Sequence, residues 1–525
     1  MPLQTGPRST ASTSSGHRIA IAAALAVLVA SPALRSQAPR AAFDVFEKSI
    51  TELQNAMAAG TITSRQIVEQ YLARIDAYDQ RGPAINAFIA LNPKALDEAA
   101  AFDAERKAGR TRGPLHGIPV AIKDNYITAD LPTTGGSLAL QGFTAGRDAF
   151  MVRKLRQAGA VVIGKTNLHE LAYGITSVSS MGGQTRNPYD PSRNPGGSSG
   201  GTGAAVAASF AAAGMGTDTC GSIRIPSAHN NLFGLRGTRG LSSRDGIIPL
   251  SMTQDIGGPL ARSVADLILM LDATVGFDPA DPVTSASDGK IPRTYMGSVG
   301  DSSLGDVHVA ILTPYFGAAP EDEEVGAIVR KAVGDLENMG ARVSEVAPEG
   351  FDALLLGTSL INAEFKFDLL DFLAKFRGPV PVRSLHEVLT SGLYHNAIDG
   401  VLRRADEVES RDNETSRTAH AKRETATRAI ADLLAQRGIT ALAYPTIRRK
   451  AAPVGEAQPG SNCQLSATTG LPAIAMPAGF TADGLPVGLE LLGSAFSEPT
   501  LLRIAFAYER VVRPRRAPGS TPPLR

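Results

Sequence analysis

Two kinds of segment alternate along much of this 525-residue chain: short apolar runs bounded by glycine or proline, and stretches with helical periodicity. The runs 118–122 and 160–164 have the length and composition of buried strands, and segment 150–158 between them repeats apolar residues at helix spacing. Similar apolar runs occur at 307–312, 442–445 and 473–477. Because strands that alternate with helices form sheets covered on both faces, the sequence predicts the α/β class.

Further segments have clear helical signals. Residues 63–66 have the side chains of a capping box, and apolar residues follow them at helix spacing. A run of small residues predicts a helix over 203–213, and the stretch 350–436 is expected to be mostly helical. No internal repeat or long flexible linker divides the chain, so we expect residues 39–525 to form one domain.

The first 38 residues have the organisation of an export signal. A basic segment with Arg8 and Arg18, and without acidic residues, precedes a continuous apolar run over 19–30. This run is too short to span a bilayer, which takes about 20 residues. We expect a signal peptide over residues 1–38 and an exported, periplasmic or secreted mature chain with no integral membrane span. An uncleaved membrane anchor is the alternative.

Composition and missing motifs exclude several function classes. Lysine and arginine number 52 against 51 acidic residues, so the net charge of +1 does not point to nucleic acid as a partner. Two cysteines, Cys220 and Cys463, cannot build a disulfide framework or a multi-cysteine zinc site. The chain has no phosphate-binding loop motif, and the nearest approach to a zinc-protease motif, at His169, has Tyr173 in place of the second histidine. We therefore expect no metal and no cofactor.

Two loops rich in glycine and serine, 195–203 and 216–224, are the most unusual part of the sequence. Glycine permits positive φ angles and close backbone approach, so such a loop can aim successive N–H groups at one point. This cradle could bind a phosphate or the oxyanion of acyl transfer, and a serine at its centre would have its hydroxyl beside an oxyanion hole. Taken alone, each loop is equally compatible with an ordinary tight turn.

A lysine at the end of an apolar strand, Lys123 within segment 117–125, favours the catalytic interpretation. Lysine seldom lies in apolar surroundings without a partner. Burial penalises the charged ammonium and can lower its pKa from about 10.4 into the neutral range. A neutral amine can act as a general base, and serine–lysine pairs are a known alternative to the serine–histidine–aspartate triad.

The lysine segment and the two loops together resemble the amidase signature family, over roughly residues 45 to 510. The likeness is strongest in block 187–226, which contains Gly196-Gly197-Ser198-Ser199-Gly200-Gly201 and Gly221-Ser222-Ile223-Arg224. Lys123-Asp124-Asn125 and the segments 470–473 and 484–488 also look like family segments. The resemblance implies one large α/β/α domain around a mixed, twisted β-sheet.

Carried over position by position, the resemblance implies a Ser-Ser-Lys triad that hydrolyses a carboxylic acid amide, through a serine acyl-enzyme, to an acid and ammonia or an amine. Ser222 matches the nucleophile, Ser198 the bridging serine, whose peptide bond is cis in the family, and Lys123 the base. The N–H groups that match the oxyanion hole belong to Thr219, Cys220, Gly221 and Ser222. The positions that match loop-supporting residues are Asp218, Arg224, Gly196 and Gly197.

Cys220 departs from the family, which usually has glycine at this position. A cysteine here is strained if the position requires a positive φ angle; otherwise its Cβ narrows the pocket. Cys220 as the nucleophile is an alternative, but the family spacing places Ser222 in that role.

Substrate identity is not readable from the sequence. The stretch equivalent to 172–180, beginning with Ala172 and Tyr173, lines the substrate channel in family members. Region 240–259 looks most like the peptide amidase and aryl acylamidase branches, and substrate range is expected to depend on the variable, mostly helical region 280–440. A small-molecule amide is the expected partner, and oligomeric state stays open, with a homodimer as one alternative.

Three other interpretations compete with a free-standing amidase. Residues 197–201 formally satisfy the GxSxG motif of α/β-hydrolases, but segment 187–195, with its prolines, does not fit the strand that must precede it. The amidase component of a tRNA-dependent amidotransferase shares the motifs of this chain, although an export signal argues against it. An exported binding protein that kept the fold without catalysis is the third alternative.

Overall fold

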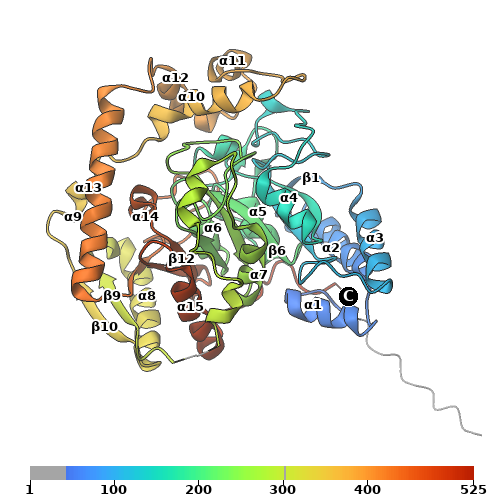
Figure 1. The fold of residues 1–525 in the computed structure, drawn as a ribbon, viewed down its shortest axis with the longest axis horizontal. Coiled ribbons are helices and arrows are strands. Elements are labelled where there is room, and N and C mark those ends of the chain that lie inside the picture. The colour runs from blue at the N-terminus through green and yellow to red at the C-terminus, as the bar shows by residue number, and fades with distance from the viewer. Residues whose placement is uncertain (1–42, 301–302, 525) are drawn as a thin grey trace, which may run out of the picture. The chain divides into compact units, whose positions relative to one another are not determined.

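An eleven-stranded sheet organises the residues that the computed structural model describes, 43–300 and 303–524 (Figure 1). In spatial order its strands are β1 (Phe88–Leu91), β3 (Val161–Thr166), β2 (Pro119–Lys123), β6 (Ala213–Asp218), β8 (Ile256–Ala261), β7 (Phe233–Arg236), β12 (Ala473–Phe480), β13 (Pro486–Leu492), β11 (Ala441–Pro445), β9 (His308–Leu312) and β10 (Arg342–Val346). A separate two-stranded ribbon pairs β4 (Val178–Ser179) with β5 (Gly183–Gln184).

Parallel and antiparallel pairs are mixed in the large sheet. β2 runs parallel to β3 and β6, and β9 runs parallel to β10 and β11, while the other neighbouring strands are antiparallel. Every residue of β2, β3, β6 and β8 is buried, as expected for strands covered on both faces. The mixed sheet with flanking helices confirms the predicted fold class.

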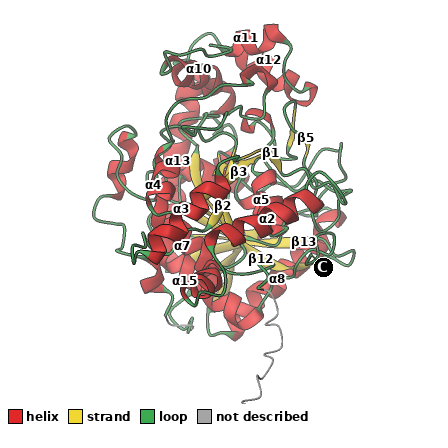
Figure 2. Cartoon of the chain, turned by 90° about the vertical axis from the view of Figure 1, so that its right-hand side faces the viewer, coloured by secondary structure: helices red, strands yellow, loops and turns green. Residues whose placement is uncertain are grey.

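Helices surround the strands, which lie in the interior in Figure 2. The helices are α1 (Ile50–Ala58), α2 (Ser64–Tyr78), α3 (Ala95–Lys107), α4 (Phe150–Gln157), α5 (Gly200–Ala207), α6 (Arg224–His229), α7 (Val264–Thr274), α8 (Pro320–Asn338), α9 (Phe351–Leu355), α10 (Ile361–Ala374), α11 (Leu385–Ser391), α12 (Asp399–Asp406), α13 (Glu414–Arg437), α14 (Gln464–Thr469) and α15 (Glu498–Val512). Helices α5 and α6 pack against each other and against central strands. In a second group, α4 packs against α7, α7 against α15 and α15 against α8, and α7, α8 and α15 also contact the sheet.

Local sequence patterns predicted many of these elements. The expected strand runs correspond to β2, β3, β9, β11 and β12. The predicted capping box begins α2, where Thr63 Oγ1 accepts from the Gln66 N–H at 3.2 Å and Gln66 Oε1 accepts from the Thr63 N–H at 2.9 Å. Helices α9 to α13 occupy the stretch expected to be helical.

The helix expected over 203–213 is wrong in its second half. α5 ends at Ala207, and Ala213 begins β6, which pairs with β2 on one side and β8 on the other. Alanine favours a helix in isolation, but residues 208–212 form turns and bends and only Ala213 enters the sheet. Tertiary context therefore overrides a propensity of less than about 1 kcal/mol per residue. This correction matters for the site, because β6 includes residues 216–218, which were expected in the second glycine-rich loop, and leads directly into the rest of that loop.

Helices α10, α11 and α12 pack together and lie at the top of Figure 1, and α13 runs from them along the left side toward β9 and β10. In the described part of the chain, no helix has both the length and the apolar character needed to cross a membrane. The expected signal peptide over 1–38 falls outside the described residues, so both it and the domain start at residue 39 stay predictions.

Candidate active site

The parallel pairing of β2 with β6 positions the predicted base. Ile122 lies opposite Met215, so Lys123, at the end of β2, lies beside the end of β6. Its side chain is fully buried, and its Nζ lies 2.7 Å from Ser198 Oγ and 2.7 Å from Thr217 Oγ1. The strand therefore carries the amine into the interior and holds it between two hydroxyl groups.

A second buried lysine shows what distinguishes Lys123. Lys165, on the neighbouring strand β3, forms an ion pair of 2.8 Å with the buried carboxylate of Asp124. Lys123 has no ion-pair partner among the described residues. Burial lowers the pKa of both lysines; for Lys123 it lowers the pKa from 10.5 to about 7, although the charges of Asp255 and Asp218 oppose the shift. Lys123, the buried lysine without a carboxylate partner, is thus the one that contacts Ser198.

These contacts make Lys123 chemically suited to accept a proton. A neutral amine keeps one lone pair, so the Ser198 hydroxyl can donate to Nζ while an amine N–H donates to Thr217 Oγ1. Thr217 Oγ1 also accepts from Asn125 Nδ2 at 3.0 Å, which orients the threonine. Thr217 was not identified from the sequence, and no pattern around it reveals its role, because only the register of β2 and β6 brings it to Lys123.

The first glycine-rich loop presents Ser198 through close backbone packing. The Gly197–Ser198 peptide bond is cis. A Cβ at Gly197 would lie 2.9 Å from the backbone carbon of Ile175, so any larger residue would push the loop away. The Ser199 N–H donates to the Ser222 carbonyl oxygen at 3.1 Å, which holds the first loop alongside the second.

The second loop connects β6 to α6 and contains the predicted oxyanion hole. Within the described part of the chain, the N–H groups of Thr219, Cys220 and Ser222 have no hydrogen-bond partner. The Gly221 N–H instead donates to Asp218 Oδ1 at 2.8 Å. Of the four N–H groups expected to form an oxyanion hole, three have no partner among the described residues and one supports the loop. The oxyanion hole itself stays a prediction.

A fully buried ion cluster braces this loop. Asp218 accepts from Arg224 Nε at 3.0 Å and from Arg236 Nη1 at 3.0 Å, and Arg224 also pairs with Glu490. Burial raises the pKa of Asp218, but the two arginine charges outweigh this effect and hold its pKa well below its usual range. Asp218 is therefore ionised, and its carboxylate supplies a counter-charge to both arginines, alongside Glu490, and anchors the loop.

Ser222 itself lies in the turn before α6 and is 4% exposed. Its Oγ has no hydrogen-bond partner among the described residues, so the link from Ser198 Oγ to Ser222 Oγ is not a hydrogen bond in this structure. Catalytic hydrogen bonds are often long without substrate and tighten in the Michaelis complex. The structure thus brings Lys123, the predicted base, into contact with Ser198, the predicted bridging serine, while the predicted nucleophile Ser222 makes no side-chain hydrogen bond within the described residues.

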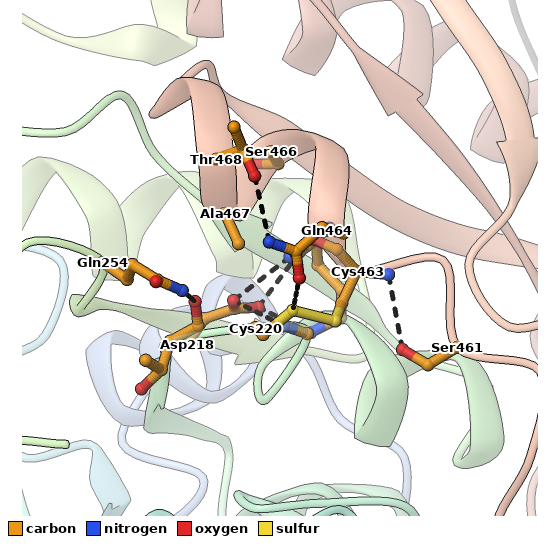
Figure 3. Close-up of a disulfide and its surroundings, with 12 residues drawn as sticks. Asp218, Cys220, Gln254, Ser461, Cys463, Gln464, Ser466, Ala467 and Thr468 are labelled. Carbon is orange, nitrogen blue, oxygen red and sulfur yellow. Dashed lines mark hydrogen bonds and ion pairs between the residues drawn. A yellow bond between two sulfur atoms is a disulfide. The ribbon is translucent and has the colours of Figure 1, made fainter. Parts of the chain in front are cut away.

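Cys220 forms a disulfide with Cys463, at the start of α14, with 5.0 Å between their Cα atoms (Figure 3). Two cysteines are too few for a framework, but they do form this single bond across 243 positions. Cys220 is absent from the non-glycine residues with positive φ, so the expected backbone strain does not arise. The Cys220 sulfur is bonded to Cys463, so it is not available as a nucleophile in this form of the protein.

Of the two residues predicted to line the substrate channel, Tyr173 contacts the helical region. Ala172 is buried, with a φ of +61°, and Tyr173 hydrogen-bonds Asn362 on α10 through its hydroxyl. The Tyr173 ring also packs edge-on against Phe365, with 5.3 Å between ring centroids. Their role as channel residues stays a prediction.

Comparisons with known proteins agree on one family. The family model described as Amidase matches residues 66–502. The structure is similar to the X-ray structure of native peptide amidase from Stenotrophomonas maltophilia, with a TM-score of 0.84 and 40% identity, covering 90% of this chain and 98% of that chain. A glutamyl-tRNA(Gln) amidotransferase component of Chloroflexus aurantiacus is 37% identical over 489 residues, 88% of this chain and 96% of the relative. A probable amidase of Arabidopsis thaliana is 34% identical over 492 residues, 91% of this chain and 92% of that protein.

Proposed function

Because this chain belongs to the amidase family, and is therefore an amidohydrolase acting on C–N amide bonds, we propose that it works through an acyl-enzyme on Ser222, with Ser198 as proton relay and Lys123 as base. The observation that carries this assignment is the 2.7 Å contact between Ser198 Oγ and a buried lysine amine whose pKa lies at about 7. A protonated lysine could only donate to Ser198; the neutral amine can take its proton.

The proposed reaction begins with proton transfer. Ser198 passes its proton to Lys123 Nζ and takes one from Ser222, so that Ser222 Oγ attacks the amide carbonyl. The tetrahedral oxyanion is bound by the free N–H groups of Thr219, Cys220 and Ser222. Each such donor can contribute on the order of 10²–10³ in rate.

The second half of the cycle releases the amine. The proton on Lys123 returns through Ser198 to the departing nitrogen, because an amine leaves poorly unless it is protonated. Water then attacks the acyl-enzyme and gives a proton through Ser198 to Lys123. That proton returns through Ser198 to Ser222 Oγ as the acid is released. The chain supplies base, relay and oxyanion donors from its own residues.

We further propose that the mature chain is exported and acts alone on small amides, with peptide C-terminal amides as the first class to test. The apolar segment 19–30 supports export, and the 40% identity to a peptide amidase supports the substrate class. The amidotransferase relatives support the alternative of an amidase component of a tRNA-dependent amidotransferase, for which the side-chain amide of glutamine is the substrate to test. Activity on glutamine alone would favour that alternative.

The test combines labelling with a substrate panel. We expect a fluorophosphonate to label the wild-type protein on Ser222 and the enzyme to hydrolyse some members of a panel of peptide, aryl and aliphatic amides. Ser222→Ala should be neither labelled nor active. Labelling of Ser222→Ala at the wild-type rate would contradict the assignment, and a folded wild-type protein that is neither labelled nor active would indicate a silent binding protein.

A further inference from the structure

The only two cysteines of the chain join the oxyanion loop to a distant helix. Cys220 stands two positions before the proposed nucleophile, and its own N–H is one of the three free donors. Cys463 comes from a segment 243 positions away, directly before α14. The bond therefore ties the donor-bearing part of the loop to a separate element of the fold.

The rest of the loop is anchored on either side of Cys220. Thr219 Oγ1 donates to Asp255 Oδ1 at 2.5 Å, and the Gly221 N–H donates to Asp218. Between these two anchors, Cys220 makes no backbone hydrogen bond within the described residues. The disulfide is thus the restraint that acts on this residue itself.

The Cys463 end of the bond is well fixed. The Cys463 N–H donates to Ser461 Oγ at 3.3 Å (Figure 3). The Cys463 carbonyl oxygen accepts from Arg224 Nη2 at 3.2 Å. The next residue, Gln464, donates through Nε2 to Thr358 Oγ1 at 2.9 Å. A Cβ added to Gly221 would lie 2.8 Å from Cys463 Cβ, so Cys463 also packs against the loop at Gly221.

We propose that the Cys220–Cys463 disulfide positions the oxyanion loop, so that Cys463 is a positioning residue for amide hydrolysis and the oxidised protein is the fully active form. This inference rests on the proposed function, since it assigns the loop N–H groups to the oxyanion. Cleaving the bond frees Cys220 to turn and misaligns its N–H, and a displacement of about 1 Å can cost on the order of 10²-fold in rate.

The bond can be opened by a small dithiol. Both cysteines are partly exposed, and the described residues contain no free cysteine that could exchange with them. Dithiothreitol supplies two electrons and two protons: the protein S–S bond breaks, two cysteine thiols form, and the reagent closes to its cyclic disulfide. The same enzyme sample can therefore be compared in both states.

The experiment compares wild type with Cys220→Ala, Cys463→Ala and the double variant, each before and after dithiothreitol, with active sites counted by fluorophosphonate titration. We expect kcat per titrated site to fall about tenfold or more in every variant and in reduced wild type, with KM changed by less than about threefold. The double variant should lose no more than either single variant, because both act through one bond. Cys463→Ala is the matched control for reduction, and dithiothreitol should leave its kcat unchanged.

A transition-state analogue separates positioning from loss of folded protein. A peptide aldehyde adds to the nucleophile and places its oxygen in the oxyanion hole, so its inhibition constant should rise by the factor by which kcat/KM falls. A purely structural role would leave that constant unchanged in the titrated enzyme. Reduced wild type that keeps its kcat and its aldehyde affinity would overturn the inference while leaving the proposed function intact; a folded, oxidised wild type without amidase activity or labelling would overturn both.

Discussion

Replacing Lys123 with methionine tests whether the folded protein really holds a neutral lysine beside Ser198. The pKa of Lys123 falls from 10.5 in the unfolded chain to about 7 in the fold, because the side chain is fully buried. At pH values between these two pKa values, Lys123 is protonated in the unfolded chain and neutral in the folded protein. The wild type should therefore gain stability as pH rises through this window, and the cost of burying Lys123 is largest below pH 7.

The size of the effect follows from the two pKa values. Between pH 7 and pH 9, proton linkage should raise the free energy of unfolding of wild type relative to Lys123→Met by about 2 kcal/mol. Methionine has similar length and no titratable group, so the variant lacks this contribution. Other titrating groups are present in both proteins and cancel in the difference.

Urea unfolding at the two pH values, followed by far-ultraviolet circular dichroism because the chain has no tryptophan, measures this difference. The variant should also lose amide hydrolysis. Lys165→Met is the matched control: it leaves the buried Asp124 carboxylate without its 2.8 Å partner, so it should destabilise the protein by roughly 3–5 kcal/mol at pH 7. A wild-type minus Lys123→Met difference that is the same at both pH values would refute the neutral-lysine argument.

Three further predictions concern the loop and the base. Asp218→Asn should lower the free energy of unfolding by about 3–5 kcal/mol in chemical denaturation, because it leaves two buried arginines short of a counter-charge. The control Asp76→Asn, at an exposed ion pair, should cost less than about 1 kcal/mol. Gly221→Ala should reduce kcat far more than Gly60→Ala does. Both glycines have positive φ, but only a Cβ at Gly221 would meet neighbouring atoms, at 2.7 and 2.8 Å. Equal effects of the two substitutions on kcat would contradict the crowding argument. In a pH–rate profile, kcat/KM should fall on the acid side through about pH 7 as Lys123 is protonated, and a flat profile from pH 5 to 8 would contradict its role as base.

Local sequence patterns predicted those parts of the fold that depend on local physics. The apolar run at β2 and the capping box of α2 need only nearby residues, and both predictions are confirmed. β6 was missed because its sequence, Ala-Gly-Met-Gly-Thr-Asp, has little β propensity and adopts a strand only between β2 and β8. The overlong helix prediction came from the alanine-rich residues just before β6, of which only Ala213 enters the strand.

In the candidate site, too, the residues recognised from the sequence are those that local patterns identify. The lysine, the two serines and their loops are recognisable from residue type and spacing. Thr217 and the Cys220–Cys463 bond are not, because the first depends on strand register and the second on contact between segments 243 positions apart. The commitment of the Gly221 N–H to Asp218 is likewise visible only in three dimensions.

The central claim is that Ser222 carries the acyl group. Rapid acid quenching during amide turnover, followed by peptide mapping by mass spectrometry, locates that group directly. The account predicts a substrate-derived acyl adduct on Ser222 and its disappearance in Ser222→Ala. An adduct on Ser198, or amide turnover by Ser222→Ala at the wild-type rate, would contradict it.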